Sequence, residues 1–431
     1  MTQTKQRRSH GATMKVLALA IGAFGSTASH AAAFQLLEGN ASGLGNAYAG
    51  TAAVAEDAST VFFNPAGMTL LPGRNVAFSV DLVRPQAEFS NRGSVAAGGQ
   101  PVVGGNGGDA GDWAGIPAGY MSWQLTDRLF AGLGVGAPFG LKTHYNNDWA
   151  GRFHAVKSEL KTVNINPSIA FKVNDVFSIG FGVNFQRIDA DLTNAVNTAA
   201  LAGAGTSALG RIKGDDTAWG WNVGAMWQVS DTTRLGVAYR SKVDYKLEGT
   251  ARFTGSAAAI LNGARGGDVT ADVEMPDTAT LSVMQKISDR WTMMGDLSWT
   301  GWSTLQKLEV NRVDGVNVTT EELKWRDTWR VAFGGTYAYT DALSLKFGLA
   351  WDQTPVRDTS RLPRVPDEDR VWLSAGVQWR PNATSAVDVG YAHLFVKDAK
   401  ISANGGAAKG FLVGEYENSV DILGVQYSTR F

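Results

Sequence analysis

Apolar and polar residues alternate with a period of two along many short segments of the chain. From Leu343 to Trp351, every second residue is Leu, Phe or Trp. Segments 177–185, 371–379 and 423–431 repeat the pattern, with mostly small or polar residues at the intervening positions. Such alternation places the apolar side chains on one face of a β-strand. The chain is therefore predicted to be all-β, with strands that are apolar on one face.

Two kinds of connection alternate between the predicted strands. Short turns that each contain Asp or Asn lie near residues 127, 174, 231, 289, 341 and 382. Longer polar or Gly-rich loops are centred near residues 105, 147, 205, 263, 314, 361 and 405. Six short turns and seven long loops connect fourteen strands. Because they alternate, the short turns lie at one end of the strands and the long loops at the other. A soluble β-sandwich has no reason to sort its connections in this way, whereas outer-membrane barrels do so.

We therefore predict a 14-stranded antiparallel transmembrane β-barrel over residues 73–431. The C-terminal Phe431 lies on the apolar face of the last predicted strand, which resembles the end of bacterial outer-membrane barrels. Because both ends of the barrel lie on the short-turn side in this prediction, both termini are expected to be periplasmic.

The first 31 residues have the pattern of a secretion signal. Four basic residues surround or precede an apolar run at 16–23, and small residues at 29–33 offer cleavage sites. The apolar run is too short to span a bilayer, which argues against an N-terminal membrane anchor. Residues 1–31 are therefore predicted to be a signal peptide, and the mature chain to begin near Ala32.

The composition of the remaining chain excludes several functions. There is no Cys, so disulfides and thiolate catalysis are excluded. Without the four signal cations, 35 basic residues face 40 acidic ones, and no basic stripe suggests a nucleic-acid partner. The remaining histidines, at 144, 154 and 393, lack metal-ligand spacing, and no Ser/His/Asp set stands out. We predict no enzyme activity, no metal and no cofactor.

Residues 32–72 differ from the strands that follow. They are apolar and rich in small residues, and the Ala-rich centre at 47–60 suits one or two helical turns. Asn64, Pro65 and Ala66 close this segment, because Pro65 has a fixed φ and no N–H, and restricts Asn64 before it. A barrel of fourteen strands is too wide for wall side chains alone to fill, since about eight strands is the size that fills itself. Residues 32–72 are therefore predicted to form a partly helical hatch inside the barrel.

The sequence AAFQLLEGNASGLGNAYAG at 32–50, then DAST at 57–60 and Asn64-Pro65-Ala66, resembles the outer-membrane long-chain fatty-acid transporter family (FadL-type), which includes aromatic-hydrocarbon importers. WTGWS at 299–303, RDTWR at 326–330 and PDEDRVWLSAG at 366–376 are similar to later strands of that family. The resemblance implies a plugged barrel that takes up a hydrophobic small molecule without energy input and releases it sideways through a gap in the wall. We expect a monomer surrounded by outer-membrane lipid and lipopolysaccharide.

The third predicted strand, 129–136, continues into Ala137-Pro138-Phe139-Gly140. Pro cannot donate to a strand ladder, so Pro138 either kinks the strand inward or ends it where the loop begins. The neighbouring fourth strand carries Pro167 as well. In the family that the sequence resembles, the position of Gly140 lies in such a kink. We therefore predict a kink and a lateral exit at Pro138, Phe139 and Gly140.

The ligand contacts are predicted less directly. Phe34 matches an aromatic residue of the family that touches ligand in the lumen, although packing within the hatch would also explain it. A carboxylate in an apolar pocket requires a cation. The chain departs from the family where basic residues are expected, since segments 189–194 and 321–324 are largely acidic or neutral. The remaining candidate cations are Arg187, Lys324, Arg326 and Arg370.

This departure leaves the ligand open between a fatty acid and an aromatic hydrocarbon. Of the four cations, Arg370 is predicted to face the lumen, because it shares the parity of Trp372 and Ser374. A general diffusion porin is a further alternative with the same architecture. It would narrow an open lumen with a loop that carries opposed charges, whereas this chain has an apolar N-terminal segment.

Overall fold

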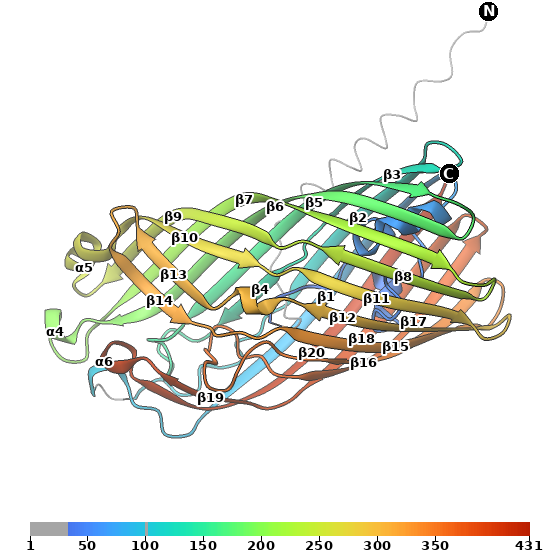
Figure 1. The fold of residues 1–431 in the computed structure, drawn as a ribbon. Helices are drawn as coiled ribbons and strands as arrows, with labels where there is room; N and C mark the ends of the chain where they lie inside the picture. The colour runs from blue at the N-terminus through green and yellow to red at the C-terminus, as the bar shows by residue number, and fades with distance from the viewer. Residues whose placement is uncertain (1–32, 100–101) are drawn as a thin grey trace, which may run out of the picture.

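The computed structural model describes residues 33–99 and 102–431, so the predicted signal peptide lies outside the described residues. The chain forms one antiparallel sheet that closes into a barrel (Figure 1). It closes because β1 (Arg74–Asn91) pairs with both β2 (Ala114–Gln124) and β20 (Phe411–Arg430). Six wall strands are interrupted once, so the twenty strand segments make fourteen strands around the barrel, as predicted.

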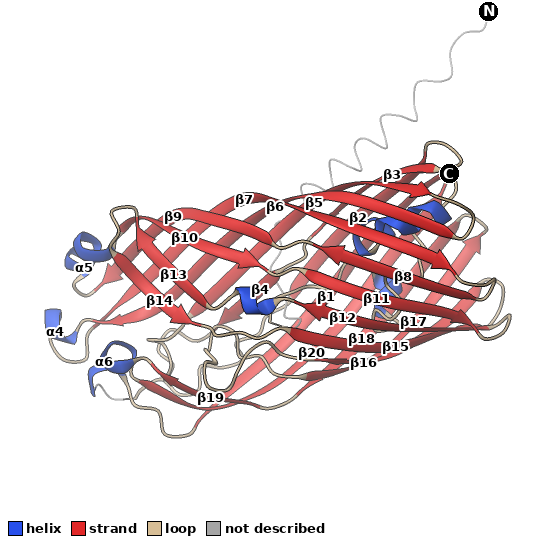
Figure 2. Ribbon diagram, viewed as in Figure 1, coloured by secondary structure: helices blue, strands red, loops and turns tan. Residues whose placement is uncertain are grey.

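The wall between β2 and β20 is continuous in sequence order (Figure 2). Its segments are β3 (Leu129–Gly136), β4 (Gly140–His144), β5 (Lys157–Lys172), β6 (Phe177–Asn197), β7 (Ser207–Gln228), β8 (Thr233–Arg240), β9 (Val243–Gly255), β10 (Gly267–Met275), β11 (Thr278–Lys286), β12 (Trp291–Thr300), β13 (Lys307–Arg312), β14 (Asn317–Glu322), β15 (Thr328–Ala338), β16 (Leu343–Asp352), β17 (Arg370–Asn382), β18 (Ser385–Val396) and β19 (Ala399–Asn404). The interrupted strands are β3/β4, β8/β9, β10/β11, β12/β13, β14/β15 and β18/β19.

The two ends of the barrel differ as the alternation of turns and loops predicts. The short turns lie at the right-hand end in Figure 1, beside the C-terminus. The long loops lie at the other end and carry the helices α4 (Ala199–Ala202), α5 (Ala258–Arg265) and α6 (Gly406–Lys409). A short 3-10 helix, Ala97–Gly99, lies in the first long loop.

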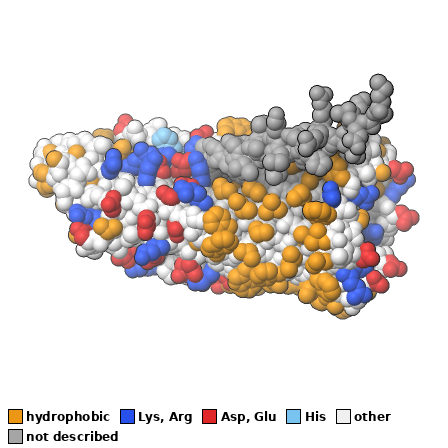
Figure 3. All heavy atoms as spheres, turned by 90° about the horizontal axis from the view of Figure 1, so that it is seen from above, with side chains coloured by type: hydrophobic (Ala, Val, Ile, Leu, Met, Phe, Trp, Pro, Cys, Tyr) orange, Lys and Arg blue, Asp and Glu red, His pale blue; other side chains and the backbone are white. Residues whose placement is uncertain are grey.

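The outer face of the short-turn half is apolar. Its strands expose large side chains such as Phe333, Leu349 and Leu373, which are 64%, 53% and 55% exposed. On the face that Figure 3 shows, hydrophobic side chains form a broad orange band that gives way to charged residues toward the long loops. This is the outward apolar face of a transmembrane barrel.

Among the described residues, no helix has both the length and the hydropathy that a membrane crossing requires.

Residues 33–72, here called the hatch segment, lie inside the barrel (blue in Figure 1). The segment contains α2 (Ala41–Leu44), α3 (Thr60–Phe63) and a 3-10 helix, Pro65–Leu70. These lie mostly outside the stretch 47–60, where we predicted helical turns. The centre is irregular because Ala47, Tyr48 and Ala55 have φ values of 50°, 54° and 49°, which interrupt a right-handed helix. α3 ends before Asn64, whose side chain accepts a hydrogen bond from Ala66 N at 3.1 Å.

The hatch segment packs directly on the wall. A Cβ atom on Gly236 would lie 1.9 Å from the carbonyl oxygen of Ala52, so only glycine allows this approach. Asn64 joins the two parts, because its Nδ2 donates to Ala52 O at 2.7 Å and to Ala225 O of β7 at 3.1 Å. The sequence motif at 64–66 therefore both shapes the hatch segment and fastens it to the barrel.

Candidate functional site

Two of the cavities that the described residues form lie inside the barrel on either side of Phe34 and Gln35. The first, which we call the apolar cavity, lies toward the long loops and is lined by β5, β6, β7, β9, β10 and the loop 353–369. The second, which we call the polar chamber, lies between the hatch segment and the wall strands β7, β8, β11, β12 and β15. Phe34 lines the first cavity, whereas its neighbours Gln35 and Leu36 line the second.

The apolar cavity has a volume of about 120 Å3. One row of paired residues runs across its wall through Leu160, Ala190, Gly214, Gly249 and Val269. The three central members are small, so the wall recedes there. Larger apolar side chains complete the lining, among them Leu141, Ile188, Leu192, Ile212, Leu247, Leu305, Leu308 and Leu362. The cavity therefore offers an alkyl chain or an apolar ring a site that excludes water.

A group of charged residues lies at one end of the apolar cavity. Arg364 is 8% exposed and donates to Ser158 Oγ at 3.1 Å and to Lys157 O at 3.3 Å. Its Nε lies 4.0 Å from Glu321 Oε1 and, among the described residues, has no hydrogen-bond partner. Lys409 Nζ lies 2.5 Å from the same carboxylate oxygen. Two cations thus share one carboxylate.

Burial sets the protonation state of this group. Burial lowers the pKa of Arg364, but guanidinium remains charged at neutral pH because its usual pKa is so high. Burial, and then Lys409, lowers the pKa of the neighbouring His154 to about 4, so this imidazole is neutral. The group therefore carries one net positive charge, and it includes a buried Nε–H of Arg364, a residue that lines the cavity, without a hydrogen-bond partner among the described residues.

Four aromatic rings separate the two cavities. The ring centroid of Phe34 lies 4.8 Å from that of Trp302, 5.4 Å from Trp325 and 6.3 Å from Phe139. Trp302 and Trp325 reach the lumen because β12/β13 and β14/β15 are interrupted at 301–306 and 323–327. Trp325 lines the apolar cavity and Phe139 the polar chamber. A ligand that moves from one cavity to the other must displace this aromatic cluster.

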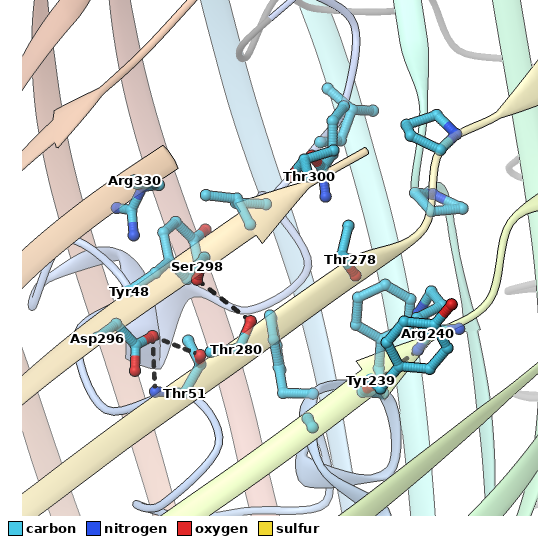
Figure 4. Close-up of a pocket in the computed structure, with 18 of the residues that line it drawn as sticks. Tyr48, Thr51, Tyr239, Arg240, Thr278, Thr280, Asp296, Ser298, Thr300 and Arg330 are labelled. Atoms are coloured by element: carbon cyan, nitrogen blue, oxygen red, sulfur yellow. Dashed lines mark hydrogen bonds between the residues drawn. The ribbon is translucent and has the colours of Figure 1, made fainter. Parts of the chain in front are cut away.

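Hydroxyl and charged groups line one side of the polar chamber (Figure 4), and apolar side chains line the other. Thr280 Oγ1 and Ser298 Oγ lie 3.2 Å apart, and Thr51 Oγ1 donates to Asp296 Oδ2 at 2.6 Å. Arg240 and Arg330 lie at different sides of the chamber in Figure 4. Pro138 and Phe139 also line it, so the chamber reaches the kinked strand.

The third wall strand is kinked at the predicted position. It is interrupted at 137–139 and resumes as β4, so Pro138 does not end it. Three residues here lie opposite two of β5, since Gly136 pairs with Asn164 and Gly140 with Lys161, which is a β-bulge. The hatch segment covers the kink from inside, because Leu36 N donates to Pro138 O and Gly140 N donates to Phe34 O, both at 2.8 Å.

The kink leaves part of the wall unpaired. The ladder between β2 and β3 stops at Gly119 and Val135, so β2 residues 114–118 pair with β1 alone among the described residues. The strands meet again where His144 N donates to Ala110 O at 3.0 Å. We call the region between these two contacts the wall gap. β2 has only small or cyclic residues at alternate positions 115, 117 and 119 beside it.

Pro167 lies on the other side of the kinked strand, opposite Leu133. It has no N–H to offer to the carbonyl of Val183 on β6. The side chain of Asn166 replaces that donor, since its Nδ2 lies 2.9 Å from Val183 O. The ladder between β5 and β6 thus stays bonded despite the proline, and the gap is confined to the β2 side.

The four cations predicted to bind ligand lie elsewhere. Arg187 is on the outer face of β6, where it forms ion pairs with Asp189 and Asp215 at 3.0 and 2.9 Å. The side chain of Lys324 is 63% exposed. Arg326 donates to Thr354 O at 3.2 Å. Within the described chain, the linings of the two cavities include none of these three residues.

Arg370 faces the lumen, as its parity with Trp372 and Ser374 predicts. It is 2% exposed and forms an ion pair with Asp367, and it too lies outside the linings of the two cavities. The cations that do line them are Lys213 and Arg364 in the apolar cavity and Arg240 and Arg330 in the polar chamber, which the sequence did not single out. Arg240 and Arg330 could have been found by parity on their strands, whereas Arg364 lies in a loop with no periodicity.

No group of three or more His, Asp or Glu side chains within the described residues is arranged to hold a metal ion.

Comparison with known proteins places this architecture in a family. Residues 22–431 match the family described as outer membrane protein transport protein (OMPP1/FadL/TodX). The chain is 31% identical to a putative outer membrane protein of Neisseria meningitidis serogroup B, over 97% of this chain and 99% of the relative. It is 27% identical to a long-chain fatty acid transport protein of Escherichia coli, over 92% and 94%.

A solved structure is similar along the whole barrel. The crystal structure of a Pseudomonas aeruginosa FadL homologue superimposes with a TM-score of 0.85 at 28% identity, covering 93% of this chain and all of that one. The resemblance seen in the sequence motifs is thereby confirmed. The chain belongs to the OMPP1/FadL/TodX family of outer-membrane transport proteins.

Proposed function

We propose that this protein takes up long-chain fatty acids, or closely similar hydrophobic molecules, passively across the bacterial outer membrane. The ligand is captured in the apolar cavity, passes the aromatic cluster around Phe34 and leaves sideways through the wall gap beside Pro138. The observation that carries this proposal is the apolar cavity with a buried, incompletely bonded guanidinium at one end.

The charges favour a monocarboxylate as ligand. A carboxylate beside Arg364 Nε would accept its unsatisfied N–H and would neutralise the net positive charge that Lys409 and Glu321 leave. Hydrogen bonds to charged groups contribute about 1.5–3 kcal/mol. The alkyl chain would then occupy the apolar lining, at about 0.8 kcal/mol for each buried CH2 group.

Import of aromatic hydrocarbons is the second candidate. Apart from the charged end, the cavity lining is apolar, and Phe34 and Trp325 present ring faces or edges to it. A neutral ring would use these contacts and would not need Arg364. The two candidates therefore differ in their dependence on a single side chain.

Binding to purified protein separates the candidates. We expect Arg364→Gln to weaken palmitate binding by about ten- to a hundredfold, which is the loss of one hydrogen bond to a charged group, and to leave hexadecane binding unchanged. Arg357→Gln, in the same loop but exposed, is the matched control and should bind both probes like the parent. Unchanged palmitate affinity in Arg364→Gln, with strong toluene binding, would support hydrocarbon import instead.

The remaining features of the proposal concern topology. Residues 1–31 serve as signal peptide, residues 32–72 as hatch and residues 73–431 as barrel. Both termini are periplasmic, which the position of the C-terminus beside the short turns supports. The protein acts as a monomer, since every wall strand finds its neighbours within one chain. Lipopolysaccharide surrounds the charged outer surface above the apolar band, and transport involves no catalytic step.

A further inference from the structure

The polar chamber has two unlike walls. One consists of apolar side chains from the hatch segment and the kink, namely Leu36, Leu37, Phe62, Phe63, Pro138 and Phe139. The other is polar and belongs to neighbouring wall strands. Its upper row of paired residues is Asn222, Arg240, Thr278, Thr300 and Thr328. Figure 4 shows the two threonines Thr278 and Thr300 on adjacent strands, with Arg240 at the side. The chamber is therefore amphipathic across its width.

Arg240 is held in this row by neutral partners. Its guanidinium donates to Asn184 Oδ1 and, at 2.7 Å, to the carbonyl oxygen of Phe62, and it lies 4.0 Å from the centre of the Phe62 ring. No ion pair joins it to a carboxylate in residues 33–99 or 102–431. The neutral partners orient the guanidinium but do not cancel its charge.

Asn184, which orients Arg240, is itself held in place by hydrogen bonds. Asn184 accepts a hydrogen bond from Asn164 Nδ2 and donates one to Asn222 Oδ1, both at 3.0 Å, and all three side chains are buried. A guanidinium has five N–H donors, so the two contacts described leave capacity for an incoming acceptor. Lys346, another lumen cation, differs because Asp388 and Glu56 lie 3.0 and 2.9 Å from its Nζ. Arg240 thus has the properties of a site for a visiting anion.

We propose that Arg240 forms a second anion site, which receives the carboxylate of a long-chain monocarboxylate after the ligand has left the apolar cavity. With the carboxylate on the polar wall, the alkyl chain lies against Phe62, Phe63 and Phe139, on the side of the wall gap. The ligand then leaves the lumen with its alkyl end first. This inference rests on the proposed uptake of fatty acids and adds a site and an orientation to it.

Such a site lowers the free-energy cost of moving an amphiphilic ligand through the lumen. An unpaired carboxylate in a low-dielectric lumen carries a large desolvation cost, which a guanidinium partner offsets. Without Arg240, the carboxylate would have to leave Arg364 for a chamber whose other charged side chains are Arg330, Asp296 and Asp352. The two acidic side chains interact with Arg330 and offset its charge. Those carboxylates would repel that of the ligand.

Substitutions can separate this role from a structural one, because Arg240 also tethers the hatch segment through Phe62 O. Arg240→Gln keeps amide donors but removes the charge, and Arg240→Lys keeps the charge. Arg234 is the matched control: it lies on the same strand, donates to Ala53 O and Val54 O at 3.1 Å, and is outside both cavity linings. Arg234→Gln therefore removes a tether without altering the proposed site.

The experiment measures uptake of labelled palmitate and hexadecane by cells that produce each variant as their transporter, at matched outer-membrane abundance, and palmitate binding by the purified proteins. We expect Arg240→Gln to lower palmitate uptake about tenfold, with hexadecane uptake and the capture of palmitate in the apolar cavity unchanged. Arg240→Lys should recover most of the palmitate uptake, and Arg234→Gln should not discriminate between the probes.

Equal losses for palmitate and hexadecane in Arg240→Gln would show a structural tether and overturn the site, as would undiminished palmitate uptake. Failure of the proposed function looks different. In that case the wild-type protein itself would bind and take up no palmitate, and the second site would fall with it.

Discussion

The apolar cavity and the polar chamber lie in the same lumen but are built from different parts of the chain. The apolar cavity is made by wall strands and the loop 353–369, and Phe34 is its contribution from the hatch segment. The polar chamber takes a large part of its lining from the hatch segment, including Leu36, Tyr48 and Phe63. In the proposed function, capture thus depends on the barrel, whereas the path onward depends on the hatch segment. The two functions can therefore be disturbed separately.

Removing the hatch segment should have the largest effect of the changes considered. It should destroy the polar chamber and leave most of the apolar cavity in place. The barrel pairings make little use of residues 33–72, apart from the bridge between Gln35 and Phe139, so a variant lacking residues 35–72 should still close. We expect its conductance in planar bilayers to rise far above that of the parent, because the chamber becomes an open pore. Palmitate binding should persist. A conductance equal to that of the parent would mean that something other than the hatch segment closes the lumen.

Filling the apolar cavity should have a moderate effect on capture. Gly214 is one of the small residues of the receding wall, and a Cβ atom there would lie 3.2 Å from Glu248 O, so a side chain fits with a small shift. Gly214→Val should weaken binding of palmitate and hexadecane alike by about fourfold for each CH2 group displaced. Calorimetric titration measures this. Ala225→Val, on the same strand with opposite parity, is the control, and a loss confined to palmitate would contradict the assigned contact.

The smallest expected effect is that of pH on the stability of the closed hatch segment. Glu38 is 1% exposed, and burial raises its pKa to about 7. Arg370 opposes this shift, Asp352 adds to it, and Asp81 and Tyr48 also face Glu38. An acid whose pKa is raised in the folded state loses stability as pH rises from its unfolded pKa through its folded pKa. The closed hatch segment should therefore loosen as pH rises from about 4.5 to about 7 and change little above that.

Glu38→Gln tests this effect, because the amide cannot ionise. Brief channel openings of the parent in planar bilayers should become more frequent as pH rises from about 4.5 to about 7 and then level off, while those of Glu38→Gln should not change. An identical pH dependence in the two proteins would exclude Glu38 as the titrating group.

The sequence predicted the barrel wall well because a period of two is a local signal. Alternation fixed which face of each strand is outward, and turn chemistry located the six short turns. The kink could be predicted from Pro138 for a similar reason. Because proline has no N–H, it disrupts the strand pairing at its own position, which is a local effect. The helical turns of the hatch segment were misplaced because contacts with wall glycines such as Gly236, and not local propensity, set its path.

The residues of the candidate site were harder to predict because the fold assembles them from distant parts of the chain. Arg364 meets Ser158, Glu321 and Lys409 only when the loop 353–369 folds into the lumen, and no local pattern marks it. In the sequence, Trp302 and Trp325 resemble aromatic residues of regular strands. In the structure they lie in the interruptions at 301–306 and 323–327, which turn them inward. The family resemblance singled out Phe34 as a candidate ligand contact, and the structure places it at the boundary between the cavities.

Lateral release through the wall gap is the central claim, and a reversible cross-link tests it most directly. The chain has no Cys, and a Cβ atom on Gly136 would lie 3.7 Å from Cβ of Ala118, which suits a disulfide at the lower edge of the gap. In Ala118→Cys/Gly136→Cys, oxidation should hold β2 and β3 together and sharply reduce palmitate uptake, and a reductant should restore it. Each single variant should transport in both states. Full uptake while mass spectrometry shows the disulfide formed would contradict release through this gap.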